Sequence, residues 1–349
     1  MSGSVTLFVM AKNEARCLRR CIDSVAAYVD HVLVLDTGST DDTVSIAQRC
    51  GAEVRHFPWE DDFGKARNVG LTAVRTRWAL ILDADEWLIS GGHSIREVAT
   101  DPGQKEAVFE LGMQMCSYEK SSEAKSTTVV GTFFTPRMFL SNVRYAGRVH
   151  ERLIHNYPIV RLPVLLGHDG YEAEQARRKK GRNFPLLEKS LAEFPKDPIM
   201  HYYMAKELQA SATLEGSFDV DLVTAIRDRY RHAVALTTDK CQTRELITRE
   251  FLMFLRSQES FEEGIRLIFS ELEKNAMSRE FSFLAAVFLY ESAFKQTCID
   301  KGLLLDAADA LFIRLKKTSD NPSNYFPYDI NLNLLASLRQ HATKQSVVG

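Results

Sequence analysis

The first 90 residues alternate between short apolar runs and segments with helical spacing, and this alternation constrains the fold more than any other feature. In the helical segments the apolar residues recur every three or four positions, as at Leu18, Ile22 and Val25. Strands that alternate with helices predict a mostly parallel, Rossmann-like sheet that is covered on both faces. The predicted strands are residues 5–10, 32–35, 53–57 and 78–82. The predicted helices are 18–29, a short helix that is capped by residues 40–43 and ends near Gly51, and 65–75.

A second region, residues 105–168, predicts a mixed extension of this sheet. Its apolar runs at 108–115, 127–134 and 159–166 are strand-like, and turn residues separate them. The polar segment 117–126 between the first two runs is predicted to be a loop.

From about residue 172 the pattern is helical to the end. The 34-residue tetratricopeptide signature is not clean, so an array of helical hairpins is predicted in place of a strict repeat. The chain therefore divides into an α/β domain at 1–175 and an all-α, tetratricopeptide-like domain at 176–349. Helices are predicted at about 172–193, 199–211, 221–237, 244–257, 260–274, 279–294, 302–317 and 330–340.

Composition disfavours several classes of protein. The formal net charge is −2, which does not favour a nucleic-acid partner. No apolar run reaches the roughly 18 residues that a membrane-spanning helix needs, and the apolar stretch at 5–10 is too short for a signal peptide. The six cysteines lack metal-site spacing, as expected for reduced thiols. We therefore expect a soluble, cytoplasmic protein, in which the basic cluster at 177–182 is a solvated helix face or a membrane-surface contact.

Polar and acidic residues follow three of the predicted strands, at Met10–Glu14, Asp36–Asp41 and Asp83–Glu86. The carboxyl ends of parallel strands meet at one edge of a sheet, and ligands bind beyond that edge. A binding site is therefore predicted where these three segments converge.

The Asp-x-Asp pair formed by Asp83 and Asp85 is the sharpest chemical signal. Two carboxylates one residue apart would repel one another in a site without water, and a divalent cation removes that repulsion. Mg²⁺ or Mn²⁺ accepts one or two carboxylates and completes its shell with phosphate oxygens and water. Such a cation would neutralise a departing diphosphate.

Other nucleotide-binding patterns are absent from the sequence or weak. Asp36 can accept a hydrogen bond from a base N–H or a ribose hydroxyl, whereas Ser39 and Asp41 can simply cap a helix. No G-x-G-x-x-G follows the first strand, and neither a phosphate-binding loop nor a G-x-S-x-G elbow occurs. Nucleotidyl transfer is a distant alternative, because residues 10–16 contain no glycine to hold a triphosphate.

Six motifs, taken together and in order, resemble family-2 glycosyltransferases with the GT-A fold. They are similar to a bacterial subgroup that includes lipopolysaccharide-core glucosyltransferases and peptide S/O-glycosyltransferases, several of which carry tetratricopeptide-like tails. The motifs are Met10–Glu14, Leu35–Thr43, Ala66–Asn68, Leu82–Glu86, Gly147–Glu151 and Gly167–Tyr171.

The resemblance implies an inverting transfer from a UDP-sugar with Mg²⁺ or Mn²⁺. Asp36 would contact the uracil, Asp83 the ribose or the metal, and Asp85 the metal. His168 and His150, near acidic residues at strand ends, are further candidate metal ligands or diphosphate contacts. The implied donor-binding set is Ala11, Asn13, Glu14, Asp36, Ser39, Arg67, Asn68, Asp83, Ala84 and Asp85.

Inversion needs one base that takes the proton of the acceptor. Glu151 is the first choice and Glu86 is the rival, although Glu151 could instead pair with the neighbouring Arg148 or Arg152. Tyr171 and Trp59 either stack on a sugar or base or belong to the core.

The predicted function is an enzyme that moves glucose or N-acetylglucosamine from its UDP-sugar to a peptide or protein side chain. Transfer to a lipopolysaccharide-core or other glycan acceptor is the alternative. The helical domain would bind the acceptor or form a homodimer. A non-catalytic scaffold is disfavoured, because all the expected acidic positions are filled.

Overall fold

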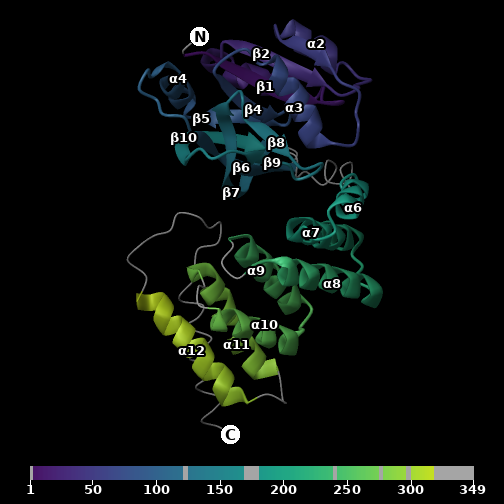
Figure 1. The fold of residues 1–349 in the computed structure, drawn as a ribbon, viewed down its shortest axis with the longest axis vertical. Coiled ribbons are helices and arrows are strands. Elements are labelled where there is room, and N and C mark those ends of the chain that lie inside the picture. Colours follow the sequence, from purple (N-terminus) through teal and green to yellow (C-terminus); the bar gives the residue numbers. More distant parts are fainter. Residues whose placement is uncertain are drawn as a thin grey trace. The chain divides into compact units, whose positions relative to one another are not determined.

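The computed structural model describes residues 3–120, 125–168, 181–238, 242–274, 278–295 and 300–317 (Figure 1). They form two compact units, Met1–Ala192 and Glu193–Gly349. Every strand of the described residues lies in the first unit. No helix among them is long and apolar enough to cross a bilayer.

The first unit is built on an eight-stranded mixed sheet with the strand order β3-β2-β1-β4-β7-β6-β10-β5. Strands β3, β2, β1 and β4 are parallel, and β7 joins β4 in the antiparallel sense. Strands β8 and β9 form a separate two-stranded sheet. The bounds are β1 Val5–Ala11, β2 His31–Asp36, β3 Glu53–His56, β4 Trp78–Asp83, β5 Glu86–Ser90, β6 Val108–Lys120, β7 Lys125–Leu140, β8 Arg144–Ala146, β9 Arg152–Ile154 and β10 Ile159–His168.

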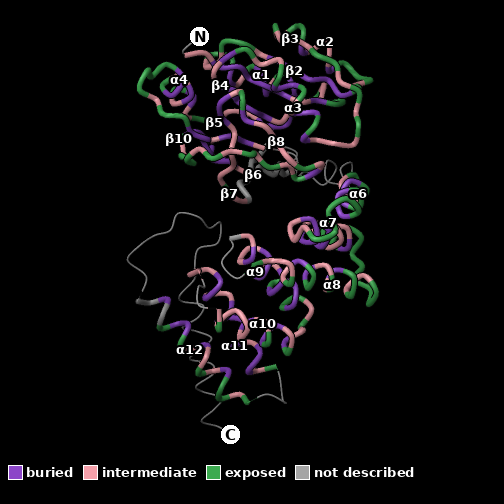
Figure 2. Tube along the Cα trace, in the orientation of Figure 1, coloured by how far each residue is buried: buried purple, intermediate pink, exposed green. Residues whose placement is uncertain are grey.

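Two interior strands, β1 and β4, are apolar along most of their length, and both of their faces are buried (Figure 2). Leu7, Phe8 and Val9 on β1 have no exposed surface, and neither do Trp78 and the four residues that follow it on β4. The helices of this part are α1 Leu18–Val25, α2 Thr43–Arg49, α3 Phe63–Ala73 and α4 Gly92–Thr100.

Close packing of α3 on β1 depends on Gly70. A Cβ atom at this position would lie 2.2 Å from Cζ of the buried Phe8 ring. We therefore expect Gly70→Ala to lower the free energy of unfolding by about 1–3 kcal/mol, measured by chemical denaturation. The matched control is Gly131→Ala, whose Cβ would meet no described atom within 4 Å. It should change stability by less than about 0.5 kcal/mol. Equal stabilities of the two variants would contradict this packing.

The second unit is helical in its described residues. Its helices are α7 Pro198–Glu215, α8 Val220–Leu236, α9 Gln242–Ser257, α10 Phe261–Glu273, α11 Arg279–Lys295 and α12 Lys301–Lys317; α6 Phe184–Glu193 precedes them. Asp197 starts α7 by accepting a hydrogen bond from the Ile199 amide, and Gly216, with φ +65°, ends it. Phe281–Tyr290 lies within α11, where residues on every side of the helix are buried, as its apolar sequence predicts.

An α/β unit with a mixed, mostly parallel core sheet, followed by helices, confirms the predicted fold class. One expectation is wrong. Residues 117–120 and 125–126 do not form a loop, because β6 continues to Lys120 and β7 begins at Lys125, with these two residues paired. The rest of the predicted loop, residues 121–124, lies outside the described residues. Backbone hydrogen bonds extend a hairpin whatever the polarity of its side chains. Residues 172–180, 330–340 and most of the basic cluster, with Tyr171, lie outside the described residues.

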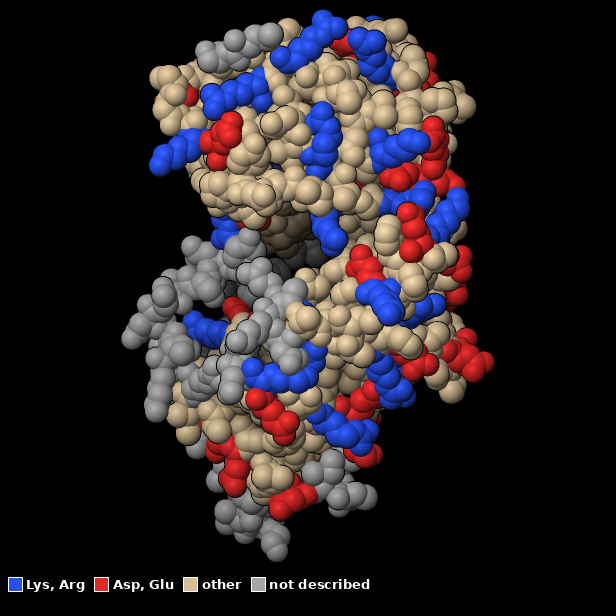
Figure 3. All heavy atoms as spheres, viewed as in Figure 1, with Lys and Arg blue, Asp and Glu red and all other residues tan. Residues whose placement is uncertain are grey.

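Charge on the described surface is mixed. Over the face drawn in Figure 3, lysine and arginine side chains are interspersed with acidic ones. No extended patch of one sign covers the described part of that face.

Candidate active site

The strand register brings the polar ends of three strands together. Met10 pairs with Asp83 across β1 and β4, and Ala11 pairs with Asp36 across β1 and β2. A cleft of about 290 Å³ opens beside them. The predicted site residues that line it are Ala11, Glu14, Arg67, Asp83, Ala84, Asp85, His150, Glu151 and His168, together with Trp59.

Two other predicted residues, Asn13 and Ser39, fasten the loops beside the cleft to each other. The Asn13 amide donates to Ser39 Oγ at 2.9 Å, and Asn13 Oδ1 accepts from the Thr40 amide at 2.8 Å. Asn13 holds φ at +57°, a left-handed conformation that asparagine tolerates better than most residues. These bonds fix the loop after β1 against the loop after β2.

Asp36 is 4% exposed and shapes the loop that follows β2. Its carboxylate accepts from the Ser39 amide at 3.1 Å and lies 3.3 Å from His56 Nδ1. Burial acts to raise the pKa of Asp36, but the hydrogen bonds from Ser39, His56 and Gly38 outweigh it and lower that pKa. Asp36 is therefore ionised at neutral pH.

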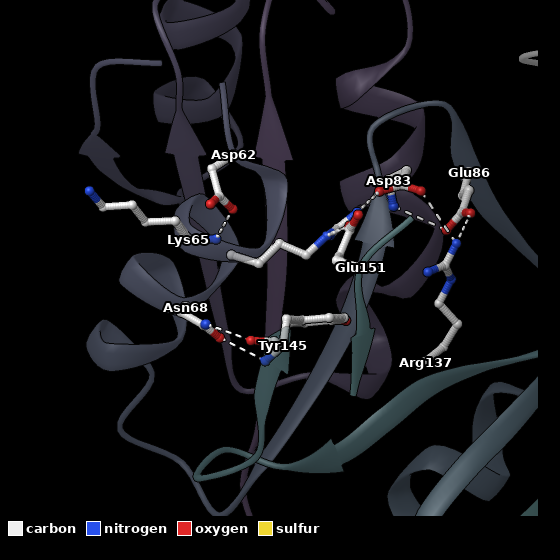
Figure 4. Close-up of polar contacts among 9 residues, drawn as sticks. Asp62, Lys65, Asn68, Asp83, Glu86, Arg137, Tyr145 and Glu151 are labelled. Atoms are coloured by element: carbon white, nitrogen blue, oxygen red, sulfur yellow. Dashed lines mark hydrogen bonds and ion pairs between the residues drawn. The ribbon is translucent and has the colours of Figure 1, made fainter. Parts of the chain in front are cut away.

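Asn68 does not line the cleft; it lines a separate surface depression and binds the backbone of β8. Its Nδ2 donates to the Tyr145 carbonyl at 2.9 Å, and its Oδ1 accepts from the Tyr145 amide at 2.8 Å (Figure 4). Asn68 thus clamps the segment that leads through Gly147 to Glu151.

A chain of alternating charges begins at the wall of the cleft and continues behind it (Figure 4). Arg67 donates from Nε to Glu151 at 2.6 Å and from Nη2 to Asp83 at 2.8 Å. Arg137 continues the chain, with Nη2 3.3 Å from Asp83 and paired with Glu86. Glu151 therefore pairs with Arg67, 84 positions away, in place of Arg148 or Arg152.

Burial and the neighbouring arginines together set the charge states along this chain. Burial opposes ionisation of Asp83, but Arg67 and Arg137 outweigh it and hold the pKa of Asp83 well below its ordinary value. Glu86 is only 2% exposed, and burial raises its pKa to about 7. Asp83 is thus fully ionised at neutral pH, whereas Glu86 is partly protonated.

Arg67 holds two carboxylates on one guanidinium, and only 8% of its side chain is exposed. Removing it in Arg67→Ala leaves Asp83 and Glu151 without this cation, so we expect a loss of about 3–5 kcal/mol in the free energy of unfolding. Urea denaturation measures the effect. The control is Arg19→Ala, which breaks the exposed pair with Asp23 and should cost less than about 1 kcal/mol. If Arg67→Ala lowered the free energy of unfolding no more than Arg19→Ala, the buried ion pairs would contribute little to stability.

On another wall of the cleft, the turn after β4 meets the end of β10. Asp85 Oδ1 lies 3.5 Å from His168 Nε2, and both side chains are largely buried. His150 also lines the cleft; its φ is +51°, and burial lowers its pKa to about 4. His150 is therefore a neutral imidazole at pH 7.

The donor set fits a divalent cation that shares its shell with a ligand. Among the described residues, no group of three or more His, Cys, Asp or Glu side chains could hold a metal ion alone. Mg²⁺ and Mn²⁺ commonly take only one or two protein carboxylates and obtain the rest from phosphate and water. Asp85 with His168 meets that requirement, whereas both oxygens of Asp83 already face arginines.

Two arginines at or beside the cleft were not predicted as site residues from the sequence. Arg137 comes from β7 and carries no motif of its own, so only the sheet pairing reveals it. Arg182 lines the cleft, and its guanidinium carbon lies 5.1 Å from the centroid of the Phe63 ring. In the sequence Arg182 is only one member of the basic cluster.

Comparisons with known proteins point to glycosyltransferases. The sequence profile of glycosyl transferase family 2 matches residues 6–91, which include β2 to β5 and all of β1 except Val5. An uncharacterized glycosyltransferase of Rickettsia felis (strain ATCC VR-1525 / URRWXCal2) is 43% identical over 211 residues, or 52% of this chain and 74% of the relative. The SPbeta prophage-derived glycosyltransferase SunS of Bacillus subtilis (strain 168) is 29% identical over 219 residues, or 59% of this chain and 49% of SunS.

Among solved structures, glucosyl-3-phosphoglycerate synthase from Mycobacterium tuberculosis, in complex with Mn²⁺, UDP and glucosyl-3-phosphoglycerate, is 25% identical to this chain. The likeness covers 32% of this chain and 44% of that one with a TM-score of 0.27, too low to support an inference. The chain spans about half the length of the first curated relatives that it matches. The extent of the Rickettsia match and the profile over the strands that build the cleft together place this chain in glycosyltransferase family 2.

Proposed function

We propose that the chain is an inverting, metal-dependent glycosyltransferase that moves a sugar from a UDP-sugar to a peptide or protein side chain. Glucose and N-acetylglucosamine are the proposed sugars, and a lipopolysaccharide-core or other glycan is the alternative acceptor. The observation that carries the proposal is the cleft at the carboxyl ends of β1 and β4, which gathers Asp85, His168 and Glu151.

In this proposal Asp85 holds Mg²⁺ or Mn²⁺, with His168 or His150 as a further ligand. When bound, the cation neutralises the charge that develops on the departing diphosphate. Asp83, fixed by Arg67 and Arg137, presents an ionised carboxylate toward the ribose. Asp36 shapes the pocket for the uracil through its bonds to the Ser39 and Gly38 amides.

Glu151 is the proposed base. In a single displacement, the acceptor oxygen or sulfur bonds to the anomeric carbon while the bond from that carbon to UDP breaks. Glu151 takes the acceptor proton. Its side chain is 14% exposed and lines the cleft, whereas Glu86 is 2% exposed and is not among the lining residues.

The second unit is proposed to bind the acceptor or a second copy of the chain. A domain boundary near residue 175 and a cytoplasmic location both stay predictions. The helical hairpins of this unit are the kind of surface that holds an extended chain.

A donor screen tests the proposed function. The protein is incubated with UDP-glucose, UDP-N-acetylglucosamine and other nucleotide-sugars, with and without Mn²⁺, and mass spectrometry follows the products. We expect one UDP-sugar to be consumed, with release of UDP, only when the cation is present. Release of pyrophosphate, or no consumption of any donor, would contradict the proposal.

A further inference from the structure

A second cavity, of about 310 Å³, shares Arg67 and Glu151 with the donor cleft. The ion pair between these two residues therefore lies between the two spaces, and the proposed base borders both. Arg137, Tyr145 and Arg152 also line this second cavity.

The lining of the second cavity is rich in cationic groups. It contains three arginines and one carboxylate, Glu151. Arg67 and Arg137 are paired with the buried carboxylates of the charge chain, but each also has one buried nitrogen, Nη1 and Nε respectively, with no hydrogen-bond partner among the described residues. Because these two nitrogens are buried, a ligand in the cavity meets the guanidinium of Arg152 first.

Arg152, on β9, carries the positive charge that a ligand in this cavity can reach most easily. Its side chain is exposed, and it forms no ion pair within the described part of the chain. A guanidinium can hold a carboxylate or a phosphate through two parallel hydrogen bonds. Arg152 also directly follows Glu151, so a group that it holds is presented near the proposed base.

We propose that the second cavity is the acceptor site, and that it selects an acceptor whose nucleophilic hydroxyl or thiol stands beside a carboxylate or phosphate. This inference rests on the proposed function. The anionic group binds Arg152, and the nucleophile meets Glu151. Glu151 takes the proton of the nucleophile, the new bond to the anomeric carbon forms, and UDP leaves through the donor cleft.

Paired acceptors that differ only in charge test this selection. One arm compares serine and cysteine peptides flanked by glutamate with the same peptides flanked by glutamine. The other arm compares glycerol 3-phosphate with glycerol, and it separates an acidic peptide from a small phosphorylated acceptor. We expect the anionic member of at least one pair to be used with about tenfold higher kcat/KM, about the effect expected of one charge-assisted contact.

Arg152 variants show whether this residue makes the selection. Arg152→Ala should raise KM for the anionic acceptor about tenfold with kcat little changed, and Arg152→Lys should restore part of the affinity. Arg49→Ala, which removes an exposed arginine from α2, is the matched control and should change neither constant.

Equal use of charged and neutral acceptors by the unaltered protein would overturn the inference. So would an equal loss for both in Arg152→Ala, or UDP-sugar hydrolysis without transfer to any anionic acceptor. In those cases the UDP-sugar is still consumed and the proposed function stands. Failure to consume any UDP-sugar would instead overturn the proposed function and this inference with it.

Discussion

Replacing Glu151 with glutamine is expected to lower kcat for sugar transfer by about 10²–10⁴-fold, the usual contribution of a positioned general base. Glutamine has nearly the same shape, and its side-chain oxygen can still accept a hydrogen bond from Arg67 Nε, so the cleft should keep its geometry. The amide cannot take the acceptor proton. Steady-state transfer assays measure kcat, and calorimetry should show unchanged affinity for UDP.

The rival base provides the matched comparison. Glu86→Gln removes a carboxyl that is buried and paired with Arg137 outside the lining of the cleft. It should therefore reduce kcat far less than Glu151→Gln, once the folded fraction is accounted for. A large loss in Glu86→Gln with near-normal transfer by Glu151→Gln would reverse the assignment of the base.

Replacing Asp85 with asparagine is expected to lower metal-supported transfer by about 10³-fold. A bound cation contributes several kcal/mol of charge stabilisation, and each 1.4 kcal/mol or so is about tenfold in rate. Asparagine keeps the size of the side chain but removes the charge that attracts the cation. Titration of activity with Mn²⁺ is the measurement, and removal of the cation from the unaltered protein with EDTA should lower its activity to a similar level.

A neutralised aspartate elsewhere controls for the change in charge. Asp23→Asn removes a carboxylate from an exposed pair with Arg19 on α1, and it should leave the Mn²⁺ titration as it was. If Asp85→Asn kept full activity and the same Mn²⁺ dependence, the assignment of Asp85 to the metal would be wrong.

Local sequence patterns predicted much of this fold, because the elements concerned are defined by short-range spacing. The predicted helices at 221–237 and 302–317 correspond to α8 Val220–Leu236 and α12 Lys301–Lys317 within a residue at each end. The parallel strands β1, β2 and β4 were likewise predicted from their apolar runs.

Elements and contacts that depend on distant pairing were missed. Strand β5 begins at Glu86, directly after the acidic turn, and it is held by antiparallel pairing with β10 about eighty residues later. The partner of Glu151 was sought among adjacent arginines, but the fold supplies Arg67 from α3. A charge network assembled from α3, β4, β7 and the segment before β9 leaves no local spacing in the sequence that could reveal it.

The central claim is that UDP and a divalent cation bind together beyond the carboxyl ends of β1 and β4. A crystal grown with UDP and Mn²⁺, examined by the anomalous scattering of manganese, tests it most directly. The expected result is one manganese peak at coordination distance from Asp85, with the diphosphate of UDP completing its shell. A manganese peak remote from Asp85, or UDP bound outside the cleft, would contradict the claim.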